Sequence, residues 1–109
     1  MTAKVEIEAG VCGFRTRATA RSDDGQNVTL EVTSDCEKIQ KVAASLNQAP
    51  LDAYREISAG GKGKLLGCAA ETLKGCCAAC AVPVGLFKSM QVAAGLALPR
   101  DISIRLSKE

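Results

Sequence analysis

The sequence predicts an α+β domain in which helices cover one face of a small, mainly antiparallel sheet. Residues 4–8, 14–21 and 28–33 alternate polar and apolar side chains, as strands with one buried face do, and residues 101–106 alternate again. Between them, apolar residues recur every three or four positions, which indicates helices. Strands grouped before helices are typical of α+β domains. We therefore expect a three-strand meander plus a C-terminal strand.

The 109 residues fit one domain, residues 1–109, which is large enough to bury about two-thirds of its surface. Hydrophobic residues make up 47% of the chain and aromatic residues only 3%, so the core must be aliphatic. A net charge of +2 with few aromatic residues argues against nucleic-acid binding. We see no signal peptide and no membrane-spanning stretch, and expect a cytoplasmic protein with reduced cysteines.

Three strands are predicted first, over residues 4–8, 14–21 and 28–33. Two glycines bracket Cys12 in the loop after the first strand. An Asp-Gly pair marks the turn between the second and third strands. The arginines of the second strand are expected on a solvated face, beside glutamates of the neighbouring strands.

A helix is predicted to start near Ser34 and Glu37, which have the spacing of a capping box. Cys36 would lie in its first turn, where the helix dipole and free N–H groups favour a thiolate. The inward stripe of this helix is Ile39, Val42, Ala43 and Leu46.

Three further helices are predicted before the last strand. The first is short, covers residues 51–57, and turns Leu51, Tyr54 and Ile57 inward. A glycine- and lysine-rich linker at residues 58–64 lacks the Walker pattern of a phosphate-binding loop. The remaining elements are a helix over residues 65–74, a helix from Pro83 to about Ala94, and the strand over residues 101–106.

Six cysteines and no histidine define the chemistry available to this chain. Without histidine, Ser-His-Asp and Cys-His catalysis and Cys–His zinc sites are excluded, and no general base for a hydrolase or transferase is evident. Thiolates bind iron–sulfur clusters and zinc. The predicted topology can bring Cys12, Cys36 and Cys80 to one end of the sheet as core ligands. Candidates for a further ligand are Cys68, Cys76 and Cys77.

Four segments together resemble a small prokaryotic family of uncharacterised cysteine-containing proteins: Val11-Cys12-Gly13-Phe14, Ser34-Asp35-Cys36-Glu37, Cys80-Ala81-Val82-Pro83-Val84-Gly85 and Gly95-Leu96-Ala97-Leu98-Pro99. The order of the three cysteines also resembles, more distantly, that of the U-type iron–sulfur cluster scaffold proteins. This second resemblance implies that Cys12, Cys36 and Cys80 assemble a cluster and pass it to a protein partner. It also implies that Asp35 is a candidate oxygen ligand.

The main hypothesis is thus a protein that binds an iron–sulfur cluster or zinc, with a protein partner for transfer, no membrane or nucleic-acid partner, and homodimer formation left open. The alternative is a non-catalytic interaction or structural domain whose cysteines fill the core. Redox activity of the pair Cys77-Ala78-Ala79-Cys80 and a disulfide framework are further alternatives.

Overall fold

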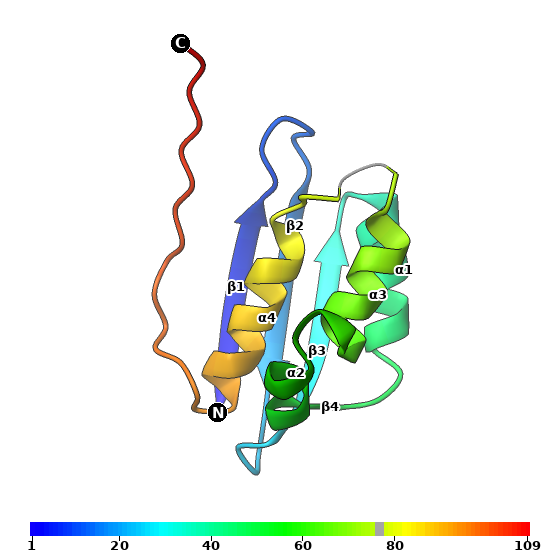
Figure 1. Cartoon of the computed structure of the whole chain (residues 1–109). Helices are drawn as coiled ribbons and strands as arrows, with labels where there is room; N and C mark the ends of the chain where they lie inside the picture. Colours follow the sequence, from blue (N-terminus) through cyan, green and yellow to red (C-terminus); the bar gives the residue numbers. More distant parts are fainter. Residues whose placement is uncertain (76–77) are drawn as a thin grey trace.

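The computed structural model describes residues 1–75 and 78–109 of the chain (Figure 1). It confirms the predicted fold class, because helices pack on a four-stranded antiparallel sheet with the strand order β1-β2-β3-β4. In chain order the elements are β1 (Thr2–Glu8), β2 (Arg15–Arg21), β3 (Asn27–Ser34), α1 (Glu37–Leu46), β4 (Leu51–Asp52), α2 (Ala53–Ala59), the 3-10 helix η1 (Gly60–Lys62), α3 (Lys64–Leu73) and α4 (Val82–Ala93).

The sheet is buried on one face only. In the antiparallel register, Val5 of β1 lies opposite Ala18 of β2, which lies opposite Val32 of β3. Alternate residues therefore share a face, and one of the two faces is turned to the helices. The buried strand residues are Ala3, Ile7, Thr16, Ala18, Ala20, Val28, Leu30 and Val32.

The other face of the sheet is exposed and carries cross-strand ion pairs, as the sequence predicted. These pairs join Arg15 to Glu8 at 3.2 Å, Arg17 to Glu6 at 3.6 Å and Arg21 to Glu31 at 2.9 Å. All six side chains are more than half exposed. Such pairs contribute at most about 1 kcal/mol each, so burial of the opposite face must dominate stability.

The helices form a single layer over the buried face (Figure 1). α4 packs on β1 and β2, α1 packs on β3, and α3 contacts both α1 and α4. The core is aliphatic, and the largest fully buried side chains include Leu30, Ile39, Leu65, Leu86 and Met90. No helix in the described part of the chain is both long and apolar enough to cross a bilayer.

The backbone of α4 lies close to the sheet at Gly85. A Cβ atom added there would overlap Cδ1 of Ile7 and lie 2.7 Å from its Cγ1. Distances below 3.0 Å are essentially never seen for real Cβ atoms, so a side chain at this position would force α4 or Ile7 to move. The absence of a side chain at Gly85 is therefore what allows α4 to lie directly on β1.

The C-terminal strand predicted over residues 101–106 is not part of the sheet. Residues 98–109 have no helix or strand and are exposed, and the fourth strand is instead the short β4, which pairs with β3. An alternating pattern produces a strand only where an edge and an apolar surface receive it. Here residues 101–106 run alongside β1 in Figure 1 without pairing with it as a strand.

Glu56 of α2 caps the N-terminus of α3. The N-cap position of α3 is Gly63, which has no side chain to accept a hydrogen bond. Oε1 of Glu56 accepts from the Leu65 N–H at 2.7 Å, and Oε2 accepts from the Lys64 N–H at 3.2 Å. The carboxylate is only 4% exposed and lies where the helix dipole favours negative charge.

This cap changes two expectations for the middle of the chain. Tyr54 and Ile57 are exposed, and the inward residues of α2 are Ala53 and Glu56, because α2 faces the start of α3. Residues 58–64 do not form an unstructured linker, since they contain the end of α2 and the 3-10 helix η1. The glycine-rich segment lies against the carboxylate of Glu56, which is 3.0 Å from the position of a Cβ added at Gly63.

Gly85→Ala is expected to lower the free energy of unfolding by about 1–2 kcal/mol, because overpacking outweighs the better helix propensity of alanine. The matched control is Gly67→Ala on α3, where an added Cβ would meet nothing closer than 3.6 Å. That change should raise the free energy of unfolding by up to about 1 kcal/mol. Urea denaturation measures both, and equal effects of the two substitutions would contradict the proposed contact.

Glu56→Ala is expected to lower the free energy of unfolding by about 1–3 kcal/mol, because two N–H groups at the start of α3 lose their acceptors. Glu71→Ala serves as the control, since Glu71 forms an exposed ion pair with Lys74 and its loss should cost at most about 0.5 kcal/mol. Thermal unfolding followed by circular dichroism distinguishes the two variants. A Glu56→Ala protein as stable as the Glu71→Ala protein would rule out the capping role.

Candidate functional site

Three cysteine-bearing segments lie at the same end of the sheet (Figure 1). They are the β1–β2 loop with Cys12, the β3–α1 junction with Cys36, and the residues before α4 with Cys80. β1, β3 and α3 run towards this end, and β2, α1 and α4 start from it. We call this region the cysteine end. The topology thus gathers the segments that the sequence singled out.

Cys12 stands in an exposed turn. Gly10 and Gly13 on either side have φ angles of 94° and 74°, a region that favours glycine, and the Gly13 N–H donates to the Gly10 carbonyl at 2.9 Å. Cys12 is exposed, and so is the neighbouring Val11. The thiol of Cys12 is therefore accessible and contributes nothing to the packed core.

Cys36 is the N-cap residue of α1, in an extended conformation. Its N–H donates to Oγ of Ser34 at 3.1 Å, and Oγ of Ser34 also lies 2.8 Å from Oγ1 of Thr16. The predicted capping box is consequently not formed, because Ser34 ends β3 and bonds across the sheet. α1 begins at Glu37, so Cys36 precedes the first turn instead of lying within it.

Cys80 lies two residues before α4 and is half-buried against the core. The Val82 N–H donates to Sγ of Cys80 at 3.5 Å. A backbone N–H that donates to sulfur is a common feature of metal-bound cysteines.

Asp35 connects two of the three segments. Its N–H donates to the Arg15 carbonyl at 3.1 Å, and its Oδ2 accepts from the Arg15 N–H at a long 3.4 Å. These bonds tie the β3–α1 junction to the start of β2, beside the loop that carries Cys12. Asp35 is exposed and belongs to the β3–α1 junction at the cysteine end.

Cys68 lies elsewhere. It lines a pocket of about 400 Å³ together with Leu46 and Gln48, at the C-terminal end of α1. The ten residues of α1 span about 15 Å, so Cys68 and Cys36 lie near opposite ends of that helix. The other two candidate ligands, Cys76 and Cys77, lie outside the described residues.

Within residues 1–75 and 78–109, no three cysteine or carboxylate side chains form a group that could hold a metal ion. Cys12, Cys36, Cys68 and Cys80 are all free thiols. The structure therefore places three predicted ligands on one end of the sheet without bringing them into a coordination sphere.

A family profile matches residues 3–106, nearly the whole chain. The chain belongs to DUF6951, a family of unknown function. No curated protein and no solved structure matches the chain. Because membership of DUF6951 carries no activity with it, the function has to be argued from the site itself.

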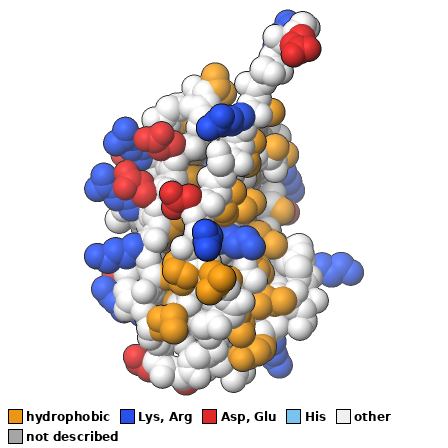
Figure 2. All heavy atoms as spheres, turned by 90° about the vertical axis from the view of Figure 1, so that its left-hand side faces the viewer, with side chains coloured by type: hydrophobic (Ala, Val, Ile, Leu, Met, Phe, Trp, Pro, Cys, Tyr) orange, Lys and Arg blue, Asp and Glu red, His pale blue; other side chains and the backbone are white. Residues whose placement is uncertain are grey.

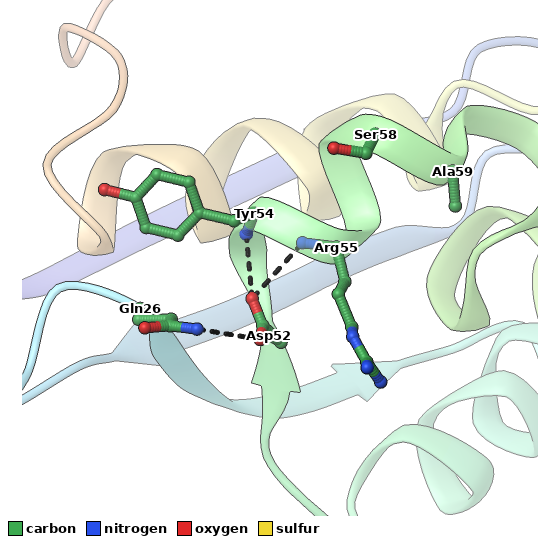
Figure 3. Close-up of a pocket in the computed structure, with 6 residues that line it drawn as sticks. All are labelled: Gln26, Asp52, Tyr54, Arg55, Ser58 and Ala59. Atoms are coloured by element: carbon green, nitrogen blue, oxygen red, sulfur yellow. Dashed lines mark hydrogen bonds between the residues drawn. The ribbon is translucent and has the colours of Figure 1, made fainter.

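The DUF6951 chain has a second candidate site that the sequence did not reveal, a shallow pocket of about 580 Å³ (Figure 3). Its lining residues are Gln26, Asp52, Tyr54, Arg55, Ser58 and Ala59. An Asp just before a short apolar run is an N-cap signal that could have located Asp52.

The polar centre of this pocket serves the fold. Asp52 accepts from the side chain of Gln26 at 2.9 Å and from the N–H groups of Tyr54 and Arg55 at 3.1 and 3.2 Å (Figure 3). The bond from Gln26, and then the bonds from α2, hold the pKa of Asp52 below its usual value. Because the carboxylate is occupied in capping α2, the cysteine end is the stronger candidate site.

A second carboxylate, Asp24, organises the turn between β2 and β3. The Asn27 side chain, followed by the N–H groups of Gln26 and Asn27, lowers the pKa of Asp24 from 3.8 to about 2. A carboxylate with a lowered pKa in the folded state stabilises the fold above its unfolded pKa. That contribution is lost as pH falls from about 4 to about 2.

Wild-type protein is therefore expected to lose stability between pH 4 and pH 2, and Asp24→Asn should reduce this loss because Asn does not titrate there. Urea midpoints measured at half-unit pH intervals test the prediction. At pH 6 the variant should be slightly less stable than wild type, since a neutral amide accepts these bonds more weakly. An unchanged pH dependence in Asp24→Asn would show that Asp24 is not responsible.

Proposed function

We propose that this DUF6951 protein binds a thiolate-ligated metal centre, an iron–sulfur cluster or zinc, through Cys12, Cys36 and Cys80. The observation that carries the proposal is the position of these three thiols on separate junctions at one end of the sheet. Ligands that converge from loops at one end of a fold are a common arrangement for such centres.

The exposed Cys12 supports a chemical role over a packing role. A buried cysteine is often no more than a small core residue, and Cys36, Cys68 and Cys80 do pack partly against the core. Cys12 has no such contact, because it lies in a solvent-exposed turn between two glycines. A loop of this kind can move its thiol towards a metal at little energetic cost.

Cys36 and Cys80 both lie beside the start of a helix. Cys36 directly precedes α1 and Cys80 lies two residues before α4, so both sulfur-bearing segments adjoin the N-terminal N–H groups of a helix. Cys80 also receives the N–H of Val82. Backbone N–H groups that donate to sulfur are a common feature of metal-bound cysteines.

The residue types in the chain limit which side chains could be the fourth metal ligand. The chain has no histidine, so a fourth ligand would be a thiolate or an oxygen. Cys76, Cys77 and Asp35 are the candidates by position, and we omit Cys68 because it lies at the other end of α1. The resemblance to U-type scaffold proteins supports transfer of the centre to a protein partner, in a reducing compartment such as the cytoplasm.

The alternative function is a non-catalytic interaction or structural domain. It is favoured by the partial burial of three cysteines, which fill space in a core poor in aromatic residues. Under this alternative no metal is retained, and only Cys12 among the four described cysteines reacts rapidly with an alkylating reagent.

Protein purified without oxygen is expected to contain zinc, or iron with acid-labile sulfide and a visible absorption band. Cys36→Ser should reduce the metal content at least about tenfold, because serine is a poor ligand for these metals. Cys68→Ser is the matched control, since Cys68 is a half-buried cysteine away from the proposed site. Elemental analysis and the visible spectrum measure both variants.

Full metal content in Cys36→Ser would exclude Cys36 from the site. Equal loss in Cys36→Ser and Cys68→Ser would indicate a general effect of destabilisation. Metal-free wild-type protein under these conditions would favour the interaction domain.

A further inference from the structure

β1 is an edge strand, and within the described part of the chain no strand pairs with its outer side. The Ala9 N–H donates to the Phe14 carbonyl, so in this antiparallel register the odd-numbered residues of β1 bond to β2. The N–H and carbonyl groups of Lys4, Glu6 and Glu8 therefore point outward. Proteins usually cover or blunt a long open edge, because its unpaired groups can bond to any available strand.

The chain turns back after α4 and brings its C-terminal segment to this edge. Gly95 ends the helix with a φ of 76°, and the Leu96 N–H donates to the Gln91 carbonyl. Gly95 lies beside Met1, since a Cβ added at Gly95 would be 3.9 Å from Cε of Met1. From this point the segment runs alongside β1 in the same direction (Figure 1). It therefore starts next to the first residue of the molecule and follows the strand that begins there.

The C-terminal segment, residues 101–106, has the residue pattern of a strand, yet its apolar side chains are exposed. It alternates polar and apolar residues, and two of the apolar ones are β-branched isoleucines, which favour strands. Ile102 is 52% exposed, Ile104 70% and Leu106 94%. Figure 2 views this side of the molecule and shows apolar side chains between charged ones. Val5 and Val92 are only partly buried there, so a strand beside β1 would cover both sets of side chains.

The segment and β1 complement each other in a parallel register. The solvent-side pairs are Asp101 with Lys4 and Arg105 with Glu8, and the helix-side pairs are Ile102 with Val5 and Ile104 with Ile7. Opposite charges face each other in both solvent-side pairs, which is favourable across neighbouring strands. A shift by two residues in either direction keeps the same faces but preserves at most one pair of opposite charges.

Pro99 is compatible with this register. In a parallel pair, every second residue of each strand turns its N–H and carbonyl groups to the partner. In the segment these residues are Ile102, Ile104 and Leu106, whose N–H groups would donate to the outward carbonyls of β1. Pro99 falls among the alternate residues that face away from β1, so its missing N–H costs no hydrogen bond.

We propose that residues 101–106 are a strap that closes onto β1 of their own molecule as a parallel fifth strand. Figure 1 shows the strap in an open position beside the edge. Closure is a sideways movement of the segment, because its starting point already lies next to Met1. The closed strap bonds the outward groups of β1 and blocks this edge to other strands. This inference is independent of metal binding, because it uses no cysteine.

The test is amide hydrogen exchange of the full-length protein, followed for each residue by NMR at two protein concentrations. Light scattering gives the mass at each concentration. The Lys4, Glu6 and Glu8 amides should exchange at least about tenfold more slowly in monomeric wild type than in Ile104→Asn, which replaces an apolar side chain of the closed strap by a polar one. Ser103→Asn is the matched control, since it places the same side chain on the solvent face, and it should exchange like wild type.

The strap itself supplies a second readout, because the register predicts alternation. The Ile102, Ile104 and Leu106 amides should be protected in wild type, whereas the Ser103 and Arg105 amides should exchange rapidly. A segment that merely collapses onto the surface would show no such alternation.

Rapid exchange of the three β1 amides in wild type would overturn the proposal, as would protection that Ile104→Asn leaves unchanged. Uniform protection along residues 101–106 would exclude strand pairing in this register. Protection that increases with concentration together with the mass would assign the edge to a second molecule and also overturn the closure of the strap within one chain.

Discussion

The contact between α4 and β1 determines where the candidate site lies. Gly85 lets the helix backbone approach Ile7 so closely that even a methyl group would be excluded. Since Cys80 precedes α4 by two residues, the placement of this helix on β1 also brings Cys80 to the end of the sheet that carries Cys12. A single backbone contact in the core therefore couples the packing of the fold to the position of a proposed ligand.

Polar side chains complete the fold at helix ends and turns. Glu56 caps α3 and Asp52 caps α2, so two carboxylates that would otherwise suggest chemistry are occupied by backbone N–H groups. Glu56 also fixes the start of α3, which runs from there to the cysteine end. Among the four described cysteines, Cys12 is the one that is exposed and does not pack against the core.

Several expectations differed from the structure because local patterns do not specify what an element packs against. Tyr54 and Ile57 are apolar and spaced as on one helix face. The structure instead turns Glu56 inward, where its carboxylate accepts from the N–H groups of Lys64 and Leu65 at the start of α3. Ser34 and Glu37 have the spacing of a capping box, but Ser34 is held by Thr16 on the neighbouring strand. In each case a hydrogen bond to a residue distant in sequence outweighed the local preference.

The sequence by itself determined the α+β class, the meander, the solvated arginine–glutamate face and the order of the helices, because these follow from periodicity and turn residues close along the chain. It also identified the three junctions that carry Cys12, Cys36 and Cys80. Only the tertiary structure decided that α4 lies against β1, that Cys68 lies away from the other described cysteines, and that residues 101–106 leave the edge of β1 open. Those outcomes depend on contacts between residues far apart in the chain, which no local pattern encodes.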